Sequence, residues 1–505
     1  MTKATIEKTI ADMDGLLLKA YNEQPLPGLA VGVVYQGELV YTRAFGFANL
    51  EQQKPVSMDT VFRIMSISKT FTALGIMQLW EQKKFDLDDP VNPHLKAMKV
   101  QNRDEAAPPV SFRHLLTHTS GIGETRGWLD FTHPVVGLGA RPDTRILSMP
   151  EYYRGRLSPE IYPGEKWSYA NHAFAVLAQL IEDISGEPFD QYMRMHVFEP
   201  LGMLKTDYIL SERVRAELAQ GYTWKKGAFV PYPYLRLNTP GCGGIFSSVR
   251  EMAKYATALM NGGENELGRI VKPATLKMMM TSQLESDPRV FSMGLGFFLE
   301  HYGKYLVAEH SGGWPGFISS LRVVPEAKVA LMAFTNVSNG APDRITSEIL
   351  HRMLGIENPA EKIPDPAILL QPADWVKFCG SYGPKPGPLT NARLWMSMGG
   401  EVEVYVRGGQ LMVRSLLMPG AKGIKIHRAD PADPMLYQGV YEKSVMKILF
   451  HQNELGSVEQ MSMGSNVLYK RPLQQSVRFR VIAGLGLLAG VLLAVLRRKR
   501  RNNKR

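Results

Sequence analysis

Three short motifs in this sequence combine residue types that can carry out nucleophilic chemistry. The first is Ser66-Ile67-Ser68-Lys69. A serine hydroxyl is a weak nucleophile until a neighbouring base accepts its proton. Ser66 and Lys69 are three residues apart, so on a helix they share one face and the lysine can act as that base. The motif is a weak signal alone, because Ser444-Val445-Met446-Lys447 matches it too, in a strand-like run.

The second motif is Tyr169-Ala170-Asn171, which opens a long apolar run. A tyrosine held near a lysine ammonium can serve as a general base. A turn with a buried tyrosine and a helix-capping asparagine would also explain these residues. Taken alone, the motif leaves both interpretations open.

The third motif is His310-Ser311-Gly312-Gly313, which lies just before a predicted hairpin. Glycines allow a strand edge to approach a substrate closely. The N–H of Gly313 is a candidate oxyanion donor, together with the N–H of Ser66. An ordinary glycine bend is the alternative.

The elements around these motifs predict an α+β fold. Residues 70–80, TFTALGIMQLW, are apolar nearly all round, which is typical of a helix buried on every side, with Ser66 at its N-terminus. Residues 28–35 and 38–48 form a predicted hairpin joined at Gln36-Gly37, and 319–325 and 329–336 form another. With helical patterns between them, these hairpins predict an antiparallel sheet built from both ends of the domain, flanked by helices and joined to an all-helical subdomain.

The sequence predicts five successive segments. Residues 1–356 form the first domain, and the proline-rich residues 357–368 a linker. Residues 369–472 contain EVEVYVR and QLMVR around Gly408-Gly409, which predicts a small antiparallel β domain, barrel-like in form. Residues 477–497 are the predicted transmembrane helix and 498–505 a basic tail.

The charge distribution suggests a membrane partner. The chain has 505 residues and a formal net charge of +11, and seven Lys or Arg lie within residues 497–505. They follow sixteen uncharged residues, Val481 to Leu496. A spanning helix needs about 20 apolar residues, and flanking arginines can make up the difference. We therefore expect a single-pass protein whose basic tail contacts anionic lipid, and no nucleic-acid partner, because no aromatic–basic surface pattern is present.

The predicted orientation rests on two opposing signals. Residues 1–15, MTKATIEKTIADMDG, lack the apolar core of a secretory signal, which favours a cytoplasmic first domain. The cations of the tail favour the opposite orientation, since positive flanks prefer the cytoplasm. We expect the cytoplasmic placement.

The order of the three motifs resembles the class C β-lactamase and esterase branch of the penicillin-recognising serine enzymes. HLLTHTSG at 114–121, EPLGM at 199–203 and GCGGIFSS at 241–248 resemble the same family, over residues 10–355 in all. The resemblance implies that Ser66 forms an acyl-enzyme, that Lys69 and Tyr169 move protons and that Asn171 hydrogen-bonds Lys69. It also implies that His310, in the third motif, is a further catalytic residue, and that Asn171, Ser311 and Gly312 contact the substrate. Residues 369–472 resemble the lipocalin-like domain attached to such hydrolases.

One departure from the family pattern bears on the substrate. Many β-lactamases and penicillin-binding proteins have Lys-Thr-Gly where this chain has His310-Ser311-Gly312. A histidine is ordinarily neutral at pH 7, so the cation that helps to anchor a substrate carboxylate is replaced. We therefore expect a membrane-anchored serine hydrolase that cleaves an ester or amide, of esterase or D-amino-acid peptidase type. The alternatives are a β-lactamase or D-Ala-D-Ala carboxypeptidase or transpeptidase, and a non-catalytic membrane scaffold or sensor.

Other candidate sites are set aside. His114 and His118 are four residues apart, but position 115 is Leu, so the HExxH glutamate is missing and neither metal nor cofactor is expected. Cys242 suits a small buried residue at a glycine turn, and Ser248 a helix cap. The loop 122–160 is expected to set the substrate, an ester, amide or peptide that the sequence does not identify. Nor does the sequence indicate an oligomeric state.

Overall fold

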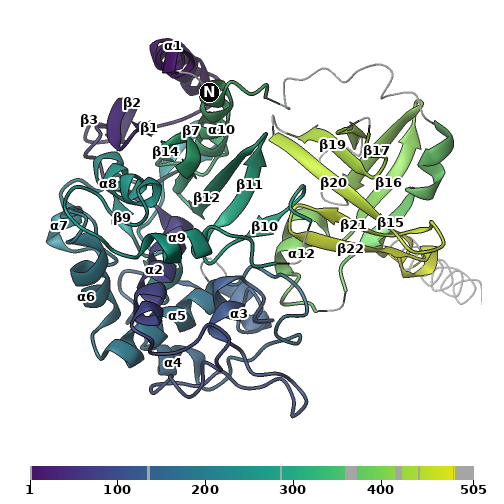
Figure 1. The fold of residues 1–505 in the computed structure, drawn as a ribbon, viewed down its shortest axis with the longest axis horizontal. Helices are drawn as coiled ribbons and strands as arrows, with labels where there is room; N and C mark the ends of the chain where they lie inside the picture. The colour runs from purple at the N-terminus through teal and green to yellow at the C-terminus, as the bar shows by residue number, and fades with distance from the viewer. Residues whose placement is uncertain are drawn as a thin grey trace, which may run out of the picture. The chain divides into compact units, whose positions relative to one another are not determined.

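A computed structural model describes the chain in two compact units, Met1–Glu361 and Lys362–Arg505 (Figure 1). The described residues are 3–133, 137–284, 287–358, 372–385, 387–415, 423–430, 432–441, 444–480 and 483. The predicted linker, residues 357–368, lies outside them from residue 359 onward.

The first unit is built on an eight-stranded antiparallel sheet in the order β10-β11-β12-β13-β14-β1-β2-β3. Its strands are β1 (Gly28–Tyr35), β2 (Glu38–Asn49), β3 (Lys54–Pro55), β10 (Ser292–Met293), β11 (Phe298–Tyr302), β12 (Tyr305–Trp314), β13 (Phe317–Val324) and β14 (Val329–Thr335). Strand β1 pairs with β14, and Leu29 lies opposite Thr335. The prediction that the sheet combines both ends of the domain is confirmed.

The predicted turn at Gln36-Gly37 has a clear backbone reason. Both residues have positive φ, 53° and 90°. Two-residue hairpins favour this conformation because its twist matches that of the strands it joins. Glycine adopts it without strain, so Gly37 fixes where β1 ends and β2 begins.

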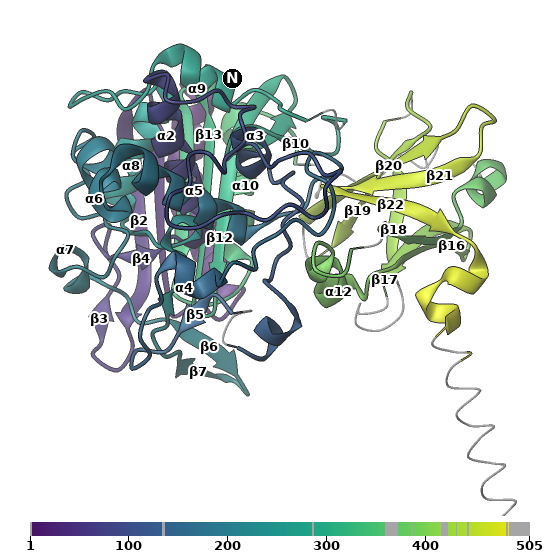
Figure 2. The ribbon, with the colours of Figure 1, turned by 90° about the horizontal axis from the view of Figure 1, so that it is seen from below.

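Helices cover both faces of the sheet, as the two views in Figure 1 and Figure 2 show together. Alternate residues of β1 point to opposite sides, as the strand pleat requires. Leu29, Val31 and Val33 pack with α1 (Lys3–Asn22) and α10 (Ala341–Leu354). Ala30 and Val34 belong to the larger core, which includes α8 (Val249–Met260). A strand buried on both faces explains why GLAVGVVY is apolar without alternation.

The helical part of the first unit surrounds α2 (Ser68–Glu81), whose residues 68–77 are all buried. Phe71 stacks on Tyr255 with 3.8 Å between ring centroids and lies edge-on to Phe198 at 5.7 Å. The prediction of a helix buried on every side is confirmed. The other helices are α3 (Phe112–Leu116), α4 (Met149–Tyr153), α5 (Asn171–Ser185), α6 (Phe189–Met193), α7 (Glu212–Arg215) and α9 (Pro273–Met279). Three short strand pairs join the loops: β4 (Phe62–Arg63) with β9 (Phe246–Ser247), β5 (Gly139–Ala140) with β8 (Arg236–Leu237), and β6 (Tyr222–Lys225) with β7 (Ala228–Pro231).

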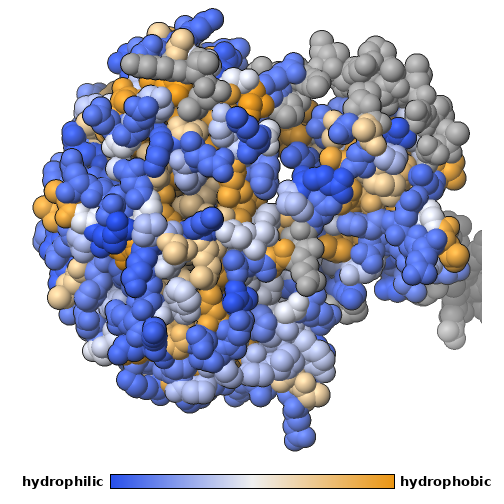
Figure 3. Space-filling model, viewed as in Figure 1, coloured by the Kyte–Doolittle hydropathy of each residue, from blue (hydrophilic) through white to orange (hydrophobic). Residues whose placement is uncertain are grey.

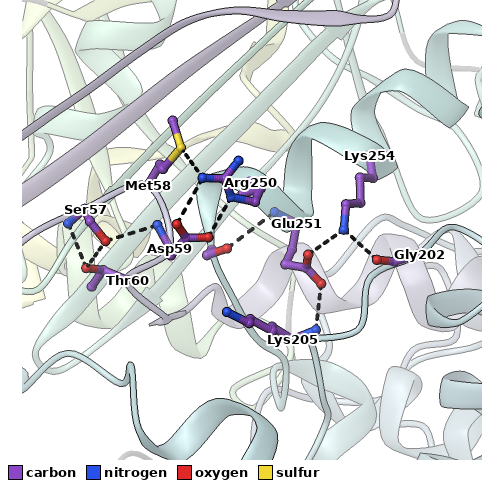
Figure 4. Close-up of polar contacts among 10 residues, drawn as sticks. Ser57, Met58, Asp59, Thr60, Gly202, Lys205, Arg250, Glu251 and Lys254 are labelled. Atoms are coloured by element: carbon purple, nitrogen blue, oxygen red, sulfur yellow. Dashed lines mark hydrogen bonds and ion pairs between the residues drawn. The ribbon is translucent and has the colours of Figure 1, made fainter.

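The first turn of α8 is tied to two earlier segments of the chain. Ser248 accepts a hydrogen bond from Glu251 N at 3.3 Å, so its predicted capping role is confirmed. The Glu251 carboxylate accepts from Lys205 N at 2.8 Å, and Arg250 donates to both carboxylate oxygens of Asp59 (Figure 4). The hydrogen bond from Arg250 lowers the pKa of Asp59. These contacts hold α8 against the segment that leads to β4.

The second unit is a closed antiparallel barrel of eight strands, β15 to β22. They are β15 (Gly380–Gly383), β16 (Val402–Arg407), β17 (Gln410–Ser415), β18 (Ile424–Arg428), β19 (Leu436–Tyr441), β20 (Ser444–Gln452), β21 (Val458–Met463) and β22 (Asn466–Arg471), with the helix α12 (Ala392–Met398). The aromatic rings of Phe378, Tyr382, Tyr437 and Phe450 lie in its core. The predicted barrel-like domain is confirmed, and the chance motif at 444–447 lies in its strand β20.

The predicted localisation, a single pass through a membrane by residues 477–497, is wrong. Within the described residues no helix has both the length and the apolar character that a bilayer span needs. The first residues of the segment instead make polar contacts, since Val477 N donates to Glu401 at 2.7 Å and Arg478 pairs with Glu403 at 2.6 Å. Residues 481, 482 and 484–505, which include the predicted basic tail, lie outside the described residues.

On the face shown in Figure 3, hydrophilic residues predominate towards the margins of the first unit and hydrophobic residues gather towards its middle. The difference between buried and exposed apolar residues gives a stability prediction. Phe71→Ala should lower the free energy of unfolding by about 3–5 kcal/mol, because it removes a ring that is fully buried between two others. Leu204→Ala, at a side chain that is 60% exposed, should change it by less than about 0.5 kcal/mol. Urea unfolding followed by tryptophan fluorescence compares the two, and equal losses would contradict the assigned core.

Candidate active site

Ser66 lies in the 3₁₀ turn η1 (Met65–Ile67) directly before α2, where it is half-buried. The preceding residue, Met65, has a φ of 49°, which is strained for a side chain other than glycine. Neighbouring hydrogen bonds hold the turn, because Ile64 N donates to Ile245 O at 3.1 Å and Ile245 N to Ser68 Oγ at 3.0 Å. The turn presents Ser66 at the helix N-terminus, as the sequence predicts.

Lys69 is fully buried, and its ammonium has three hydrogen-bond acceptors. Nζ lies 3.0 Å from Ser66 Oγ, 2.8 Å from Asn171 Oδ1 and 2.6 Å from the carbonyl oxygen of Cys242. A buried charge is tolerated where hydrogen bonds replace its water shell. The three contacts satisfy all three donors of the ammonium.

The same geometry suits transfer of one proton. The oxygens of Asn171 and Cys242 can only accept, so they retain two N–H bonds of Lys69 whether or not it is protonated. The third hydrogen-bonding direction of Lys69 Nζ points to the hydroxyl of Ser66, which can accept a hydrogen bond from an ammonium or donate one to a neutral amine. Therefore only the proton that lies between Lys69 Nζ and Ser66 Oγ can be transferred.

Tyr169 lies beside this pair and is held by the segment 114–121. Its ring has Lys69 Nζ 4.9 Å from the centroid and stacks on His118 at 4.3 Å. His118 has a φ of 58°, its Nδ1 accepts from Ala170 N at 3.1 Å and its carbonyl from Ser168 N at 2.8 Å. The family landmark HTSG thus positions the tyrosine, a role that the sequence did not reveal.

Asn171 opens α5 and links Lys69 to a residue that sequence reasoning missed. Its Nδ2 donates to Glu124 Oε1 at 2.9 Å, while its Oδ1 accepts from Lys69. Glu124 is only 5% exposed. The available sequence signal was an acidic residue three positions beyond Gly121 of the landmark, within the loop 122–160 that we expected to set the substrate.

Strand β12 brings the third motif against the turn that holds Ser66. A Cβ added to Gly312 would lie 2.1 Å from Ile64 O and 2.9 Å from Ser66 N, so only glycine permits this approach. Gly313 is exposed at the next position. The Ser311 hydroxyl donates to Asp343 of α10 instead, and its predicted substrate contact stays a prediction.

His310 belongs to a cluster of aromatic rings that continues from Tyr169. Its ring lies 6.5 Å from that of Tyr169 and 5.0 Å from that of Phe298. Phe298 in turn stacks parallel to Tyr169 at 6.3 Å, and Trp167 meets Phe291 edge-on at 5.0 Å. Trp167, Phe291 and Phe298 are half-buried, so this aromatic cluster presents part of its surface to solvent.

The residues set aside in the sequence have other partners in the structure. His114 Nδ1 accepts from Ser111 N at 3.2 Å and forms part of a helix cap, whereas His118 holds the Tyr169 segment. Burial raises the pKa of the Cys242 thiol, while nearby Lys69 opposes the rise. Its carbonyl oxygen, rather than its sulfur, is the atom that contacts the site.

Comparison with known proteins places this geometry in a family. The beta-lactamase family model matches residues 6–352. The chain belongs to the beta-lactamase family. It is a family of serine hydrolases that includes penicillin-binding proteins and esterases, and the resemblance seen in the sequence is confirmed.

Three similar proteins illustrate the range of this beta-lactamase family. A penicillin-binding protein of Bacillus subtilis (strain 168) is 25% identical over 395 residues, 73% of this chain and 83% of its own length. Esterase EstB of Burkholderia gladioli is 31% identical over 230 residues, 43% of this chain and 58% of its own length. The structure of the octameric penicillin-binding protein homologue from Pyrococcus abyssi covers 91% of this chain and 100% of its own, with 25% identity and a TM-score of 0.61.

The close approach of β12 to the Ser66 turn predicts different effects at two adjacent glycines. Gly312→Ala should lower kcat/KM for a p-nitrophenyl ester by about 100-fold, because its Cβ displaces the Ile64–Ser66 backbone. Gly313→Ala keeps its N–H and meets only Ile318 Cδ1, at 3.3 Å, so it should retain most of the activity. Equal activity of the two variants, with unchanged melting temperatures, would contradict the proposed site.

Proposed function

We propose that this protein hydrolyses carboxylic esters whose acyl group is small and uncharged, through an acyl-enzyme on Ser66. The observation that carries the proposal is the contact of 3.0 Å between Lys69 Nζ and Ser66 Oγ, with the other two directions of Nζ fixed by acceptors. A neutral amine held in this way can remove only the serine proton. The Ser66–Lys69 pair is thus equipped as nucleophile and base.

The reaction follows from these contacts. Ser66 Oγ attacks the ester carbonyl while its proton passes to Lys69, and a tetrahedral oxyanion forms. The C–O bond to the leaving alcohol then breaks, and the alkoxide takes a proton from Lys69 or, through it, from the hydroxyl of Tyr169. Water repeats the sequence on the acyl-enzyme, releasing the acid and restoring Ser66. No cofactor enters this scheme.

Two backbone N–H groups are proposed to stabilise the oxyanion. One belongs to Ser66 itself, at the N-terminus of α2, where the helix dipole also favours negative charge. The other belongs to Gly313, beside the glycine that lets β12 approach Ser66. Donors that are fixed before the reaction stabilise the transition state without having to reorganise.

The surroundings favour an ester over a charged peptide. The lysine of the third motif is replaced by His310, which lies buried among aromatic rings. Next to Ser66, Met65 contributes to an apolar cluster with Leu138, Leu235 and Trp314. The similarity to esterase EstB supports this choice, although only 58% of that protein is covered. The match with the penicillin-binding protein keeps D-alanyl peptidase or β-lactamase action as a second candidate.

Covalent labelling tests the nucleophile. A fluorophosphonate probe should label the wild-type protein and fail to label Ser66→Ala, because the probe reacts with activated serines. Ser444→Ala, in the second SxxK match of the barrel, is the control and should label like wild type. Labelling that persists in Ser66→Ala would refute the assignment, and an unlabelled wild type would favour the non-catalytic scaffold.

A substrate panel tests the choice of reaction. We expect kcat/KM to be highest for p-nitrophenyl butyrate and lower for a D-Ala-D-Ala peptide and a chromogenic cephalosporin, since both of these carry a carboxylate that His310 does not anchor when neutral. His310→Lys should raise the rate on the two anionic substrates relative to the ester. Faster turnover of either anionic substrate by wild type would favour the second candidate.

A further inference from the structure

The amide of Asn171 lies between two buried charges of opposite sign. Lys69 Nζ donates to its Oδ1 at 2.8 Å, and its Nδ2 donates to Glu124 Oε1 at 2.9 Å. Lys69 is fully buried and Glu124 is 5% exposed. The three side chains come from three separate elements, α2, the loop after Gly121 and the start of α5.

The chemistry of the two neighbours decides which way the amide faces. An ammonium only donates hydrogen bonds and a carboxylate only accepts them, whereas an amide has one end of each kind. Turning the amide by half a revolution would set two donors against each other at Lys69 and two acceptors at Glu124. Buried polar atoms left without a partner are costly, so the observed orientation is strongly preferred.

We propose that Glu124 is a positioning residue for the hydrolytic site, acting through Asn171 and not on the substrate. It keeps Oδ1 of Asn171 directed at Lys69, so that the amine lone pair meets the Ser66 hydroxyl. This inference rests on the proposed function of Ser66 and Lys69. It assigns a purpose to a buried acid that the three motifs do not include.

While Lys69 is a neutral amine, only Glu124 holds the amide in place, so without Glu124 the amide can turn and offer its NH₂ group to Lys69. The amine would then use its lone pair on Asn171, and Ser66 would lose its base. The proposal therefore predicts that the loss falls mainly on kcat, because Glu124 acts through Asn171 on the proposed base Lys69. A residue that only stabilises the loop would change the melting temperature and leave kcat of the folded protein intact.

The first test removes the carboxylate. Glu124→Ala should lower kcat for p-nitrophenyl butyrate and the rate of fluorophosphonate labelling by about 100-fold. Glu124→Gln should lose less, since its amide oxygen can still accept from Asn171 Nδ2. Glu105→Gln, at an exposed acid in another turn, is the charge-matched control and should behave like wild type.

The second test distinguishes orientation from support of the fold. Asn171→Asp should be severely impaired, because it brings a second carboxylate against Glu124. Adding Glu124→Gln should then raise kcat at least about tenfold above that of Asn171→Asp alone, since the glutamine NH₂ can donate to the new carboxylate. Glu124→Gln would thus impair the wild-type protein and improve the Asn171→Asp variant, a reversal that loss of folding does not produce.

The outcomes separate this proposal from the proposed function. Glu124→Ala with wild-type kcat, or equal kcat for Asn171→Asp with and without Glu124→Gln, would overturn the role of Glu124 while Ser66 labelling stands. If Glu124→Ala does not fold, the Asn171→Asp pair decides. A wild-type protein that neither labels nor hydrolyses esters would remove the proposed function, and this inference with it.

Discussion

The buried ammonium of Lys69 is the constraint around which the first unit is arranged. Removing such a charge from water costs several kcal/mol unless hydrogen bonds replace the lost hydration. Each of its three partners comes from a different part of the chain, namely the turn before α2, the start of α5 and the carbonyl of Cys242. Those segments must meet within hydrogen-bonding distance, or the ammonium would be left unsatisfied. The requirement that stabilises the charge therefore also assembles the proposed nucleophile and base, and a stretch of α2 that is buried on every side keeps water from competing for Lys69.

Strand β12 shows how a single strand serves both structure and site. Its alternate residues face opposite sides of the sheet. On one side, Glu309 pairs with Arg322 of β13, and Ser311 bonds Asp343 of α10. On the other, Gly312 lies against the turn that carries Ser66. The polar contacts on the side that faces α10 fix the position of β12. Because Gly312 has no side chain, the strand can then lie in close contact with the Ser66 turn.

Most of the fold followed from local patterns, because the chemistry that produces them is local. Gln36-Gly37 predicted its hairpin since the two-residue turn needs positive φ there, and the apolar run after Lys69 predicted a buried helix. The partners of Lys69 were harder to foresee. Asn171 was expected from the family resemblance, but Glu124 reaches it across 47 positions without any periodic signal. The carbonyl of Cys242 could not be predicted from a side chain, because every residue carries the same group. The prediction of a transmembrane helix at residues 477–497 was wrong because it relied on composition alone. The segment is mostly apolar, yet Val477 and Arg478 contact the acids Glu401 and Glu403.

The pairing of β1 with β14 sets the order in which the protein matures during synthesis. Gly28 and Thr335, which hydrogen-bond in the finished sheet, are 307 positions apart. At about 5–20 residues per second, a ribosome needs of the order of 15–60 s to travel from one to the other. During that interval Ser66 and Lys69 have already been synthesised, but β12 and its Gly312 have not. The edge of β1 that later pairs with β14 is meanwhile open to other strands. Topology alone therefore keeps the contact between Gly312 and the Ser66 turn from forming before β12 is made, and until β14 follows, β1 has only its hairpin partner β2.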